Sequence, residues 1–213
     1  MVGYSKYIEL ITDLISDKKV VSTGMRQERE RCEQALLIAS QGHTVSLISS
    51  GDAGIYGMAG LALELRHRMS LPIPVEIIPG VTASTAASAA MGAPLMLDFA
   101  VISLSDLLVP WEMIRKRLEC VAEADLVVAL YNPRSKRRVS QLDEAAEIFR
   151  KSRPNSTPVG IATAIGSEFE SVVLSDLGNF LNFEINMRSI VIIGNSASQI
   201  LDSLFVTPRG YLK

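Results

Sequence analysis

Three regularly spaced glycines mark the segment of this sequence whose residue types are best suited to binding a ligand. Gly51, Gly54 and Gly57 follow an apolar stretch and precede a helical pattern, and Asp52 lies between the first two. Glycine lets a backbone approach a ligand closely or adopt a positive φ, and ligands gather beyond the carboxyl ends of strands in open α/β sheets. Asp52 could accept hydrogen bonds from ribose hydroxyls or close an Asx turn, and the spacing does not decide between these roles.

The glycine spacing argues against two common phosphate-binding sites. It reads GxxGxxG instead of GxGxxG, and GxxxxGK[ST] does not occur in the chain. Binding of a dinucleotide or of ATP phosphates is therefore poorly supported. Taken alone, the loop either binds another ligand or simply connects a strand tightly to a helix.

The composition narrows the class of protein further. The two cysteines (Cys32, Cys120) and two histidines (His43, His67) form neither a CxxC nor an HxxxH pattern, so we expect no metal site and no disulfide framework. A net charge of −2 argues against nucleic acid as the main partner. No apolar stretch reaches the ~20 residues of a membrane span and the N-terminus lacks a signal peptide. We therefore expect a cytoplasmic protein with no membrane segment.

Hydrophobic periodicity predicts an α/β fold in which helices alternate with strands, and in the first half this alternation favours a parallel or mostly parallel sheet. In the first half, the predicted helices cover residues 4–15, 27–40, 59–69 and an alanine-rich stretch that ends near 91, and the predicted strands cover 19–22, 43–49 and 75–78. In the second half, the predicted helices cover 110–122 and 141–151, and the predicted strands cover 100–104, 126–130, 158–163, 170–174 and 190–193. A hinge at 92–97 would divide the chain into an N-terminal α/β domain (1–96) and a C-terminal α/β domain (97–213).

Five segments, in order, resemble motifs of the tetrapyrrole methylase family. SGDAGIYG (50–57), PGVTAS (79–84) and YNP (131–133) resemble three motifs of the family as a whole. TGMRQE (23–28) and SLSDLL with PW (103–111) resemble its branch that methylates C17 of precorrin-3B or cobalt-factor III in cobalamin biosynthesis. The resemblance covers essentially the whole chain.

The resemblance implies a fold of two α/β/α domains with S-adenosylmethionine bound in the cleft between them. It also implies an S-adenosylmethionine-dependent C-methyltransferase that releases S-adenosylhomocysteine, couples C17 methylation to ring contraction, and forms a homodimer. Members of the family usually open with a strand and a GxGPG loop ahead of a VGYxxY segment. Here VGY begins at Val2, so we expect that first strand and its loop to be absent.

The resemblance also assigns residues to the site. Cofactor contacts are implied by motif for one set of residues, namely Gly51, Asp52, Ile55, Thr82, Ala83 and Tyr131. Thr163 and Ser189 are assigned to the adenosine by their strands rather than by a motif. Ring contraction requires proton transfer, but the sequence does not identify its acid or base.

A tetrapyrrole substrate carries many carboxylates, which arginine side chains bind well. The candidate clamp residues are Arg26, Arg134, Arg137 and Arg138, the last three in a basic loop after the strand at 126–130. A charge run of this kind is also typical of a solvated surface.

Two alternatives remain open at this stage. The chain could be another methyltransferase of the same family, acting on a different precorrin carbon or on uroporphyrinogen III. It could also be a non-catalytic ligand-binding homologue that lacks the first strand.

Overall fold

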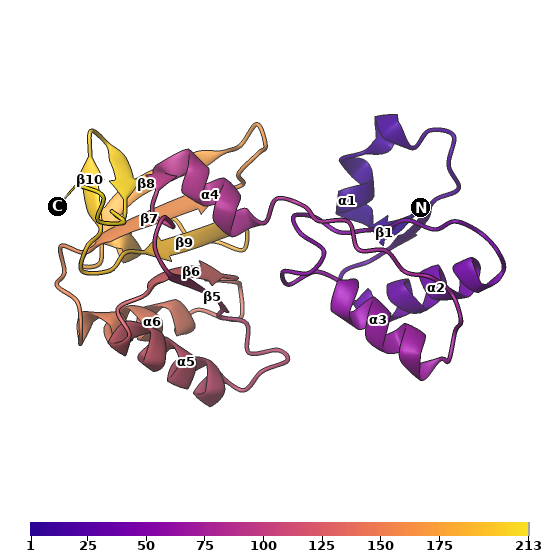
Figure 1. The fold of residues 1–213 in the computed structure, drawn as a ribbon, viewed down its shortest axis with the longest axis horizontal. Helices are drawn as coiled ribbons and strands as arrows, with labels where there is room; N and C mark the ends of the chain where they lie inside the picture. The colour runs from indigo at the N-terminus through magenta and orange to yellow at the C-terminus, as the bar shows by residue number, and fades with distance from the viewer. Residues whose placement is uncertain (213) are drawn as a thin grey trace. The chain divides into compact units, whose positions relative to one another are not determined.

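A computed structural model describes residues 1–212 and divides the chain into two compact units, Met1–Thr82 and Ala83–Lys213. The sequence placed this division at residues 96/97, after the alanine-rich helix. That helix, α4 (Ala83–Met91), instead packs on β7 (Pro158–Thr163) and β9 (Ser189–Ile193), which assigns it to the second unit (Figure 1).

The first unit contains a three-stranded parallel sheet with the order β2-β1-β3. Its elements are β1 (Val2–Tyr4), α1 (Ser5–Glu9), a 3₁₀ turn (Thr12–Leu14), β2 (Val21–Thr23), α2 (Glu28–Ser40), β3 (Leu47–Ile48) and α3 (Ala59–Arg68). Helices α2 and α3 pack together around the buried side chains of Cys32, Leu36, Met58, Ala62 and Leu65. The helices predicted at 27–40 and 59–69 are thereby confirmed.

Three predictions for the first unit were wrong. The helix expected at 4–15 is divided into α1 and the 3₁₀ turn, and its first residue, Tyr4, belongs instead to β1, which pairs with β2 and β3. The strand expected at 43–49 shortens to Leu47–Ile48. Residues 75–78 form no strand and make no backbone–backbone hydrogen bond within the described chain, so their apolar pattern alone did not produce a strand.

The second unit is built on a five-stranded sheet with the order β5-β6-β9-β7-β8. Its other strands are β5 (Phe99–Ser103), β6 (Val127–Tyr131) and β8 (Ser171–Asp176). Only β5 and β6 are parallel; β9 runs antiparallel to β6 and to β7, and β8 runs antiparallel to β7. The positions of these strands were predicted within two residues, whereas the sequence made no prediction of their directions.

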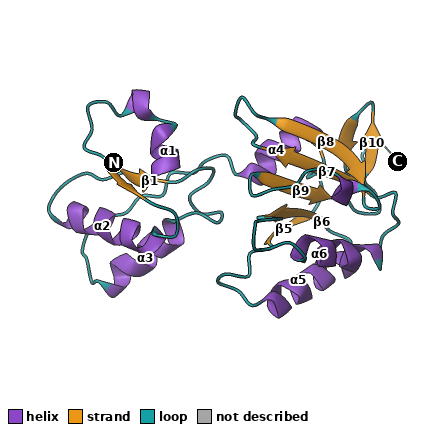
Figure 2. Cartoon of the chain, turned by 180° about the vertical axis from the view of Figure 1, so that it is seen from behind, coloured by secondary structure: helices purple, strands orange, loops and turns teal. Residues whose placement is uncertain are grey.

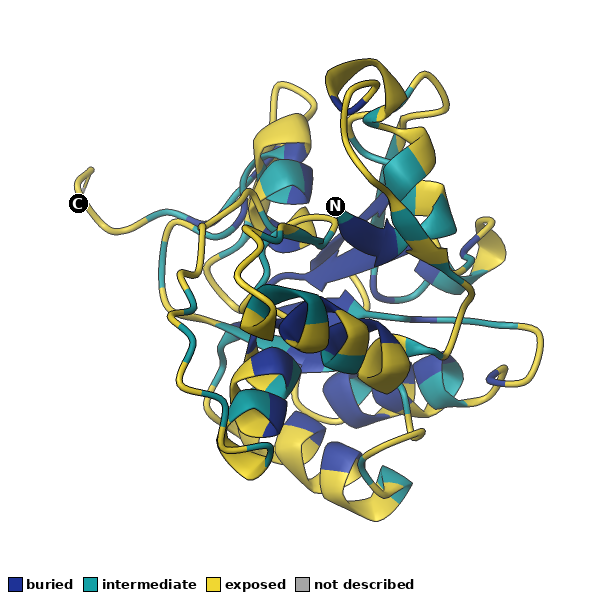
Figure 3. Cartoon of the chain, turned by 90° about the vertical axis from the view of Figure 1, so that its right-hand side faces the viewer, coloured by how far each residue is buried: buried dark blue, intermediate teal, exposed yellow. Residues whose placement is uncertain are grey.

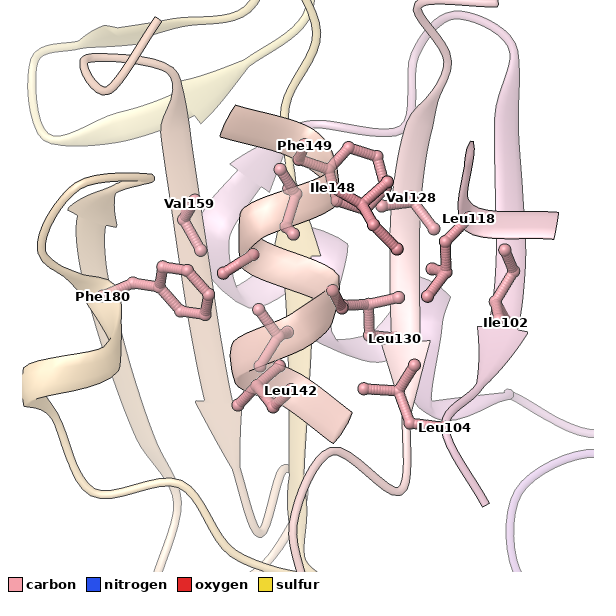
Figure 4. Close-up of a cluster of buried hydrophobic side chains, with 14 of the residues drawn as sticks. Ile102, Leu104, Leu118, Val128, Leu130, Leu142, Ile148, Phe149, Val159 and Phe180 are labelled. Atoms are coloured by element: carbon pink, nitrogen blue, oxygen red, sulfur yellow. The ribbon is translucent and has the colours of Figure 1, made fainter. Parts of the chain in front are cut away.

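Both faces of this sheet are covered, so the second unit has three layers (Figure 2). Helices α5 (Trp111–Glu123) and α6 (Gln141–Arg150) cover one face and contact Val128 and Leu130 of β6, as Figure 4 shows. The alternate residues Val127 and Ala129 point to the other face, toward α4. Because strands alternate their side chains, a sheet buried on both faces requires apolar residues at successive positions, which the sequence of β6 supplies.

Burial follows the same layers in the helices, which in Figure 3 carry dark blue inner stripes and yellow outer surfaces. In α6 the buried positions include Leu142, Ala145, Ala146 and Phe149, which recur at helical spacing. None of the described helices is long and apolar enough to cross a membrane.

The sequence missed a hairpin near the C-terminus. Strands β10 (Gln199–Leu201) and β11 (Leu204–Val206) pair antiparallel, and β11 also pairs with β4 (Gly92–Ala93). Asp202 and Ser203 form the tight connection, with φ values of 46° and 65°. This two-residue turn lacks the Asn-Gly or Asp-Gly pair that signals such a hairpin in a sequence.

Candidate functional site

The second unit brings polar residues from separate segments to one edge of its sheet. Because β6 and β7 both run antiparallel to β9, their carboxyl ends lie at the amino end of β9, together with the carboxyl end of β5. Ser103, Tyr131, Thr163 and Ser189 occupy these four ends. We call this row of strand ends the carboxyl edge.

Thr163 and Ser189, two of the residues assigned to the cofactor, are direct neighbours at this edge. Their hydroxyl oxygens lie 2.8 Å apart and share a hydrogen bond. The Ser189 hydroxyl also accepts a hydrogen bond from the backbone N–H of Asn186 at 3.0 Å. Ser189 is buried, so its hydroxyl is held in a fixed orientation.

Tyr131 links the carboxyl edge to the start of α4. Its hydroxyl oxygen accepts a hydrogen bond of 2.8 Å from the backbone N–H of Ser84, in the first turn of that helix. The neighbouring Ala83 opens the same helix, so Ala83 and Tyr131 lie on segments that this bond joins, while their contact with a cofactor stays a prediction. The amino end of a helix carries unpaired N–H groups and a partial positive charge, which suits an anionic or oxygen-rich ligand group.

Asn132 and Ser103 belong to this edge but were not identified from the sequence. Asn132 adopts a positive φ of 51°, and its side-chain amide donates a hydrogen bond of 3.0 Å to the Ser103 hydroxyl. Asparagine is one of the few residues that adopts this left-handed conformation readily. An Asn two residues after the strand predicted at 126–130 is therefore the signal that could have indicated a sharp turn at this point.

The basic loop after β6 contains arginines in different environments. Arg138 is only 9% exposed, and its Nε donates a hydrogen bond of 3.0 Å to the Asn132 carbonyl oxygen. Burial lowers the pKa of Arg138, although the nearby carboxylate of Asp106 opposes this effect. The Nη2 of Arg134 donates to both carboxylate oxygens of Asp143, at 2.8 and 3.0 Å. Of the three arginines predicted to clamp substrate from this loop, only Arg137 has an exposed side chain.

In the first unit, Asp52 joins the two glycine-containing motifs. Its Oδ1 accepts a hydrogen bond from the Gly54 N–H at 2.7 Å, and its Oδ2 accepts one from the Gly80 N–H at 2.9 Å. These bonds, first that from Gly80 and then that from Gly54, hold the pKa of the Asp52 carboxyl below its usual value. Asp52 therefore closes an Asx turn and also fixes the second loop, while its role toward a ribose stays a prediction.

Close packing between the same two loops requires glycine at two positions. A Cβ on Gly80 would collide with the carbonyl oxygen of Gly51, and Gly51 itself has a positive φ of 68°. Ile55, in the first loop, is exposed, as expected for a side chain available to a ligand. Thr82 ends this unit, two residues after Gly80.

The loop that contains Arg26 is held by its neighbours. Buried Arg31 donates hydrogen bonds to the Thr23 hydroxyl at 2.6 Å and to the Gly24 carbonyl at 2.7 Å. Gln27 accepts a hydrogen bond from the Gly24 N–H at 2.6 Å. Arg26 itself is exposed and has a positive φ of 64°, so its side chain is available to a ligand.

The donor groups of the carboxyl edge are hydroxyls and an amide, which suit the ribose and amino-acid groups of an adenosyl cofactor. Within residues 1–212, no cluster of three or more His, Cys, Asp or Glu side chains could hold a metal ion. The hydroxyls and the amide of the carboxyl edge are the groups that fit S-adenosylmethionine by their chemistry.

Comparison with known proteins shows similarity to tetrapyrrole methylases along nearly the whole chain. Residues 2–181 match the family described as Tetrapyrrole (Corrin/Porphyrin) Methylases. The chain is 49% identical over 212 residues to a probable cobalt-factor III C(17)-methyltransferase of Salmonella typhimurium, covering 99% of this chain and 88% of that protein. It is 45% identical over 215 residues to the cobalt-factor III methyltransferase of Priestia megaterium, where it covers 99% of this chain but only 40% of that longer relative.

Solved structures show the same fold. The crystal structure of the methyltransferase CobJ matches with a TM-score of 0.91 and 35% identity, over 97% of this chain and 87% of that one. A uroporphyrin-III C-methyl transferase from Thermus thermophilus, complexed with S-adenosyl homocysteine, matches with a TM-score of 0.67 and 20% identity, over 91% of this chain and 84% of that one. At that lower identity the likeness concerns the fold alone.

Proposed function

This chain belongs to the tetrapyrrole methylase family, and from that premise we propose that it methylates C17 of cobalt-factor III or precorrin-3B in cobalamin biosynthesis, with S-adenosylmethionine as methyl donor. The observation that carries the proposal is the 49% identity to a C17-methyltransferase over 99% of the chain. The order of the five motif segments, two of them typical of the C17 branch, supports the same conclusion.

When bound, S-adenosylmethionine supplies a methyl group on a positively charged sulfur. At the carboxyl edge, the hydroxyls of Tyr131, Thr163 and Ser189 would hold the cofactor, with Ala83 beside Tyr131. Because hydrogen bonds already fix these hydroxyls, they can orient a ligand without a further loss of side-chain conformational freedom. Methyl transfer depends on alignment of donor and acceptor, so a strong base is not required for this step.

In the first unit, the cofactor-binding residues would be Gly51, Asp52, Ile55 and Thr82. Asp52 fixes the backbone of both glycine loops, which presents the exposed Ile55 and the start of the PGVTAS segment in a defined conformation. Arg137 and Arg26, whose side chains are exposed, are the predicted clamp residues best placed to bind substrate carboxylates. Arg134 and Arg138, which are engaged inside the protein, support the shape of the basic loop.

Two parts of the proposal rest on the family resemblance alone, namely the coupling of methylation to ring contraction and a homodimeric assembly. A location in the cytoplasm rests on the sequence features described above. Light scattering after size-exclusion chromatography would measure the oligomeric state directly.

A methyl-transfer assay tests the proposed function. The full chain is incubated with S-adenosylmethionine and, in separate reactions, with cobalt-factor III, precorrin-3B and uroporphyrinogen III. We expect mass spectrometry to show the addition of one methyl group to one of the first two substrates, and NMR to locate it at C17. Methylation of uroporphyrinogen III alone would contradict the proposed substrate.

Binding of S-adenosylhomocysteine, measured by titration calorimetry, tests the cofactor separately. We expect saturable binding at one site per chain. A folded sample that does not bind S-adenosylhomocysteine would contradict the enzymatic function of this chain.

A further inference from the structure

We infer that Arg188 is a further specificity-determining residue, which binds a carboxylate of the tetrapyrrole substrate at the carboxyl edge. The inference rests on the proposed function, because it takes the substrate to be a polycarboxylate. No motif or charge run in the sequence singles out Arg188, which lies far along the chain from the basic loop.

The backbone places Arg188 at the carboxyl edge. It directly precedes Ser189, whose partner across the sheet is Thr163. Its carbonyl oxygen accepts a hydrogen bond of 3.0 Å from the N–H of Ala164, the residue that follows β7. Arg188 is thus fixed next to the two hydroxyls assigned to the cofactor, although its own side chain is exposed.

The side chain of Arg188 is oriented by groups that leave its charge unneutralised. Its guanidinium lies 5.8 Å from the centre of the Phe169 ring, and its Nη2 donates a hydrogen bond of 3.3 Å to the Ser167 hydroxyl. Within the described chain it forms no ion pair. A guanidinium has five N–H donors in a planar fork, so most of them stay available for a carboxylate.

One acidic side chain of the connection between β7 and β8 has another partner. Glu170 accepts a hydrogen bond of 2.7 Å from the backbone N–H of Gly166, so its carboxylate closes the turn between β7 and β8. The ring of Phe169 is 65% exposed, which leaves an aromatic surface beside the guanidinium. A flat macrocycle with acidic side chains matches this combination of an aromatic ring and a cation.

Arg188 also lies next to the basic loop. Its neighbour Met187 contacts Arg138, whose Nη2 is 3.3 Å from the Met187 sulfur. Arg138 in turn holds the Asn132 carbonyl at the start of the basic loop. Arg137 and Arg188 are therefore exposed arginines on two segments that contact each other through Arg138 and Met187. A substrate with several carboxylates needs more than one such cation.

The test compares Arg188→Gln and Arg188→Lys with a matched control, Arg209→Gln. Arg209 is also exposed, but it follows Thr207, whose hydroxyl bonds Ser198 beyond the opposite end of β9. Steady-state kinetics give KM for the tetrapyrrole, absorbance titration gives its Kd, and calorimetry gives the affinity for S-adenosylhomocysteine. Thermal unfolding verifies that all variants fold.

We expect Arg188→Gln to raise the KM and Kd for the tetrapyrrole by about tenfold, which corresponds to the loss of one charge-assisted hydrogen-bonded contact. Arg188→Lys should recover part of this loss, because lysine keeps the charge but not the fork. The affinity for S-adenosylhomocysteine should stay the same in both variants, and Arg209→Gln should match the parent protein.

The result that would overturn the inference is a parent protein that methylates a tetrapyrrole while Arg188→Gln retains its KM and Kd. An equal effect of Arg209→Gln would also overturn it, because general charge attraction would then explain the change. A parent protein that methylates no tetrapyrrole would instead refute the proposed function, so the two failures are distinguishable.

Discussion

The hydroxyl oxygen of Tyr131 accepts a hydrogen bond from the backbone N–H of Ser84, at 2.8 Å. This bond joins the last residue of β6 to the first turn of α4, across 47 residues of sequence. It fixes two of the segments that the motifs assign to the cofactor in one arrangement within the second unit.

Tyr131→Phe should loosen this arrangement. The Ser84 N–H loses its acceptor while the ring packing is retained, so we expect a loss of about 1 kcal/mol in the free energy of unfolding. We also expect weaker binding of S-adenosylhomocysteine. Urea unfolding and calorimetric titration measure the two effects, and unchanged affinity in the variant would remove Tyr131 from the cofactor site.

The lowered pKa of Asp52 predicts that the stability of the fold decreases at acid pH. The pKa of this carboxyl is held below the usual value of ~4 in the folded protein, so its hydrogen bonds stabilise the fold above that value and are lost as the pH falls through the lowered pKa. We expect the urea midpoint to fall below about pH 4 in the parent protein, and to fall less in Asp52→Asn.

At neutral pH, Asp52→Asn should weaken S-adenosylhomocysteine binding on the order of tenfold, since an amide cannot accept both backbone N–H groups. The exposed Asp98→Asn serves as the control. If Asp52→Asn unfolds more easily but binds S-adenosylhomocysteine as tightly as the parent protein, Asp52 acts on the turn alone.

Substitutions of the buried and the exposed arginines of the basic loop should have different effects. Arg138→Met removes a buried cation that holds the Asn132 carbonyl, and we expect a loss of about 2 kcal/mol in the free energy of unfolding. Arg137→Glu changes an exposed side chain, so stability should change little while KM for the tetrapyrrole rises about tenfold or more. An unchanged KM in Arg137→Glu would contradict the clamp.

The two cysteines should differ in reactivity. Burial raises the pKa of the Cys32 thiol to about 11, whereas Cys120 is exposed on α5. Because the thiolate is the reactive form, we expect Ellman's reagent at pH 8 to modify one thiol per folded chain and both in denaturant. Cys120→Ser should abolish the fast reaction, and a fast reaction that survives in this variant would show that Cys32 is accessible.

The sequence predicted the elements whose residue pattern is compatible with only one type of secondary structure. Helix α6 has buried residues at helical spacing, strand β7 is buried at successive positions, and both appear where expected. The antiparallel position of β9 was not predictable, because the apolar run of residues 189–193 suits a central strand of either direction. Tyr4 shows the opposite problem, since its apolar ring fits a helical pattern although its backbone pairs with Thr23 in the sheet.

For the candidate site, motif resemblance identified Tyr131, Asp52 and the glycine loops, but it could not distinguish one arginine from another. Arg134, Arg137 and Arg138 are equivalent as letters in a basic run. Only the three-dimensional contacts show that Asp143 neutralises the first and that the turn at Asn132 engages the last. Arg188 was missed because its position beside Thr163 depends on the pairing of β9 with β7, which the sequence alone does not show.

Residues 75–78, which form no strand, affect how readily the first unit unfolds locally. Their amides have no backbone acceptor within the described chain, and β3 pairs through only two residues. Amide hydrogen exchange should therefore be fast in residues 75–78 and slow in β9, whose five residues are all buried between two neighbouring strands. On gradual destabilisation, local opening would begin in the first unit, and the five-stranded sheet would remain as the last cooperative unit.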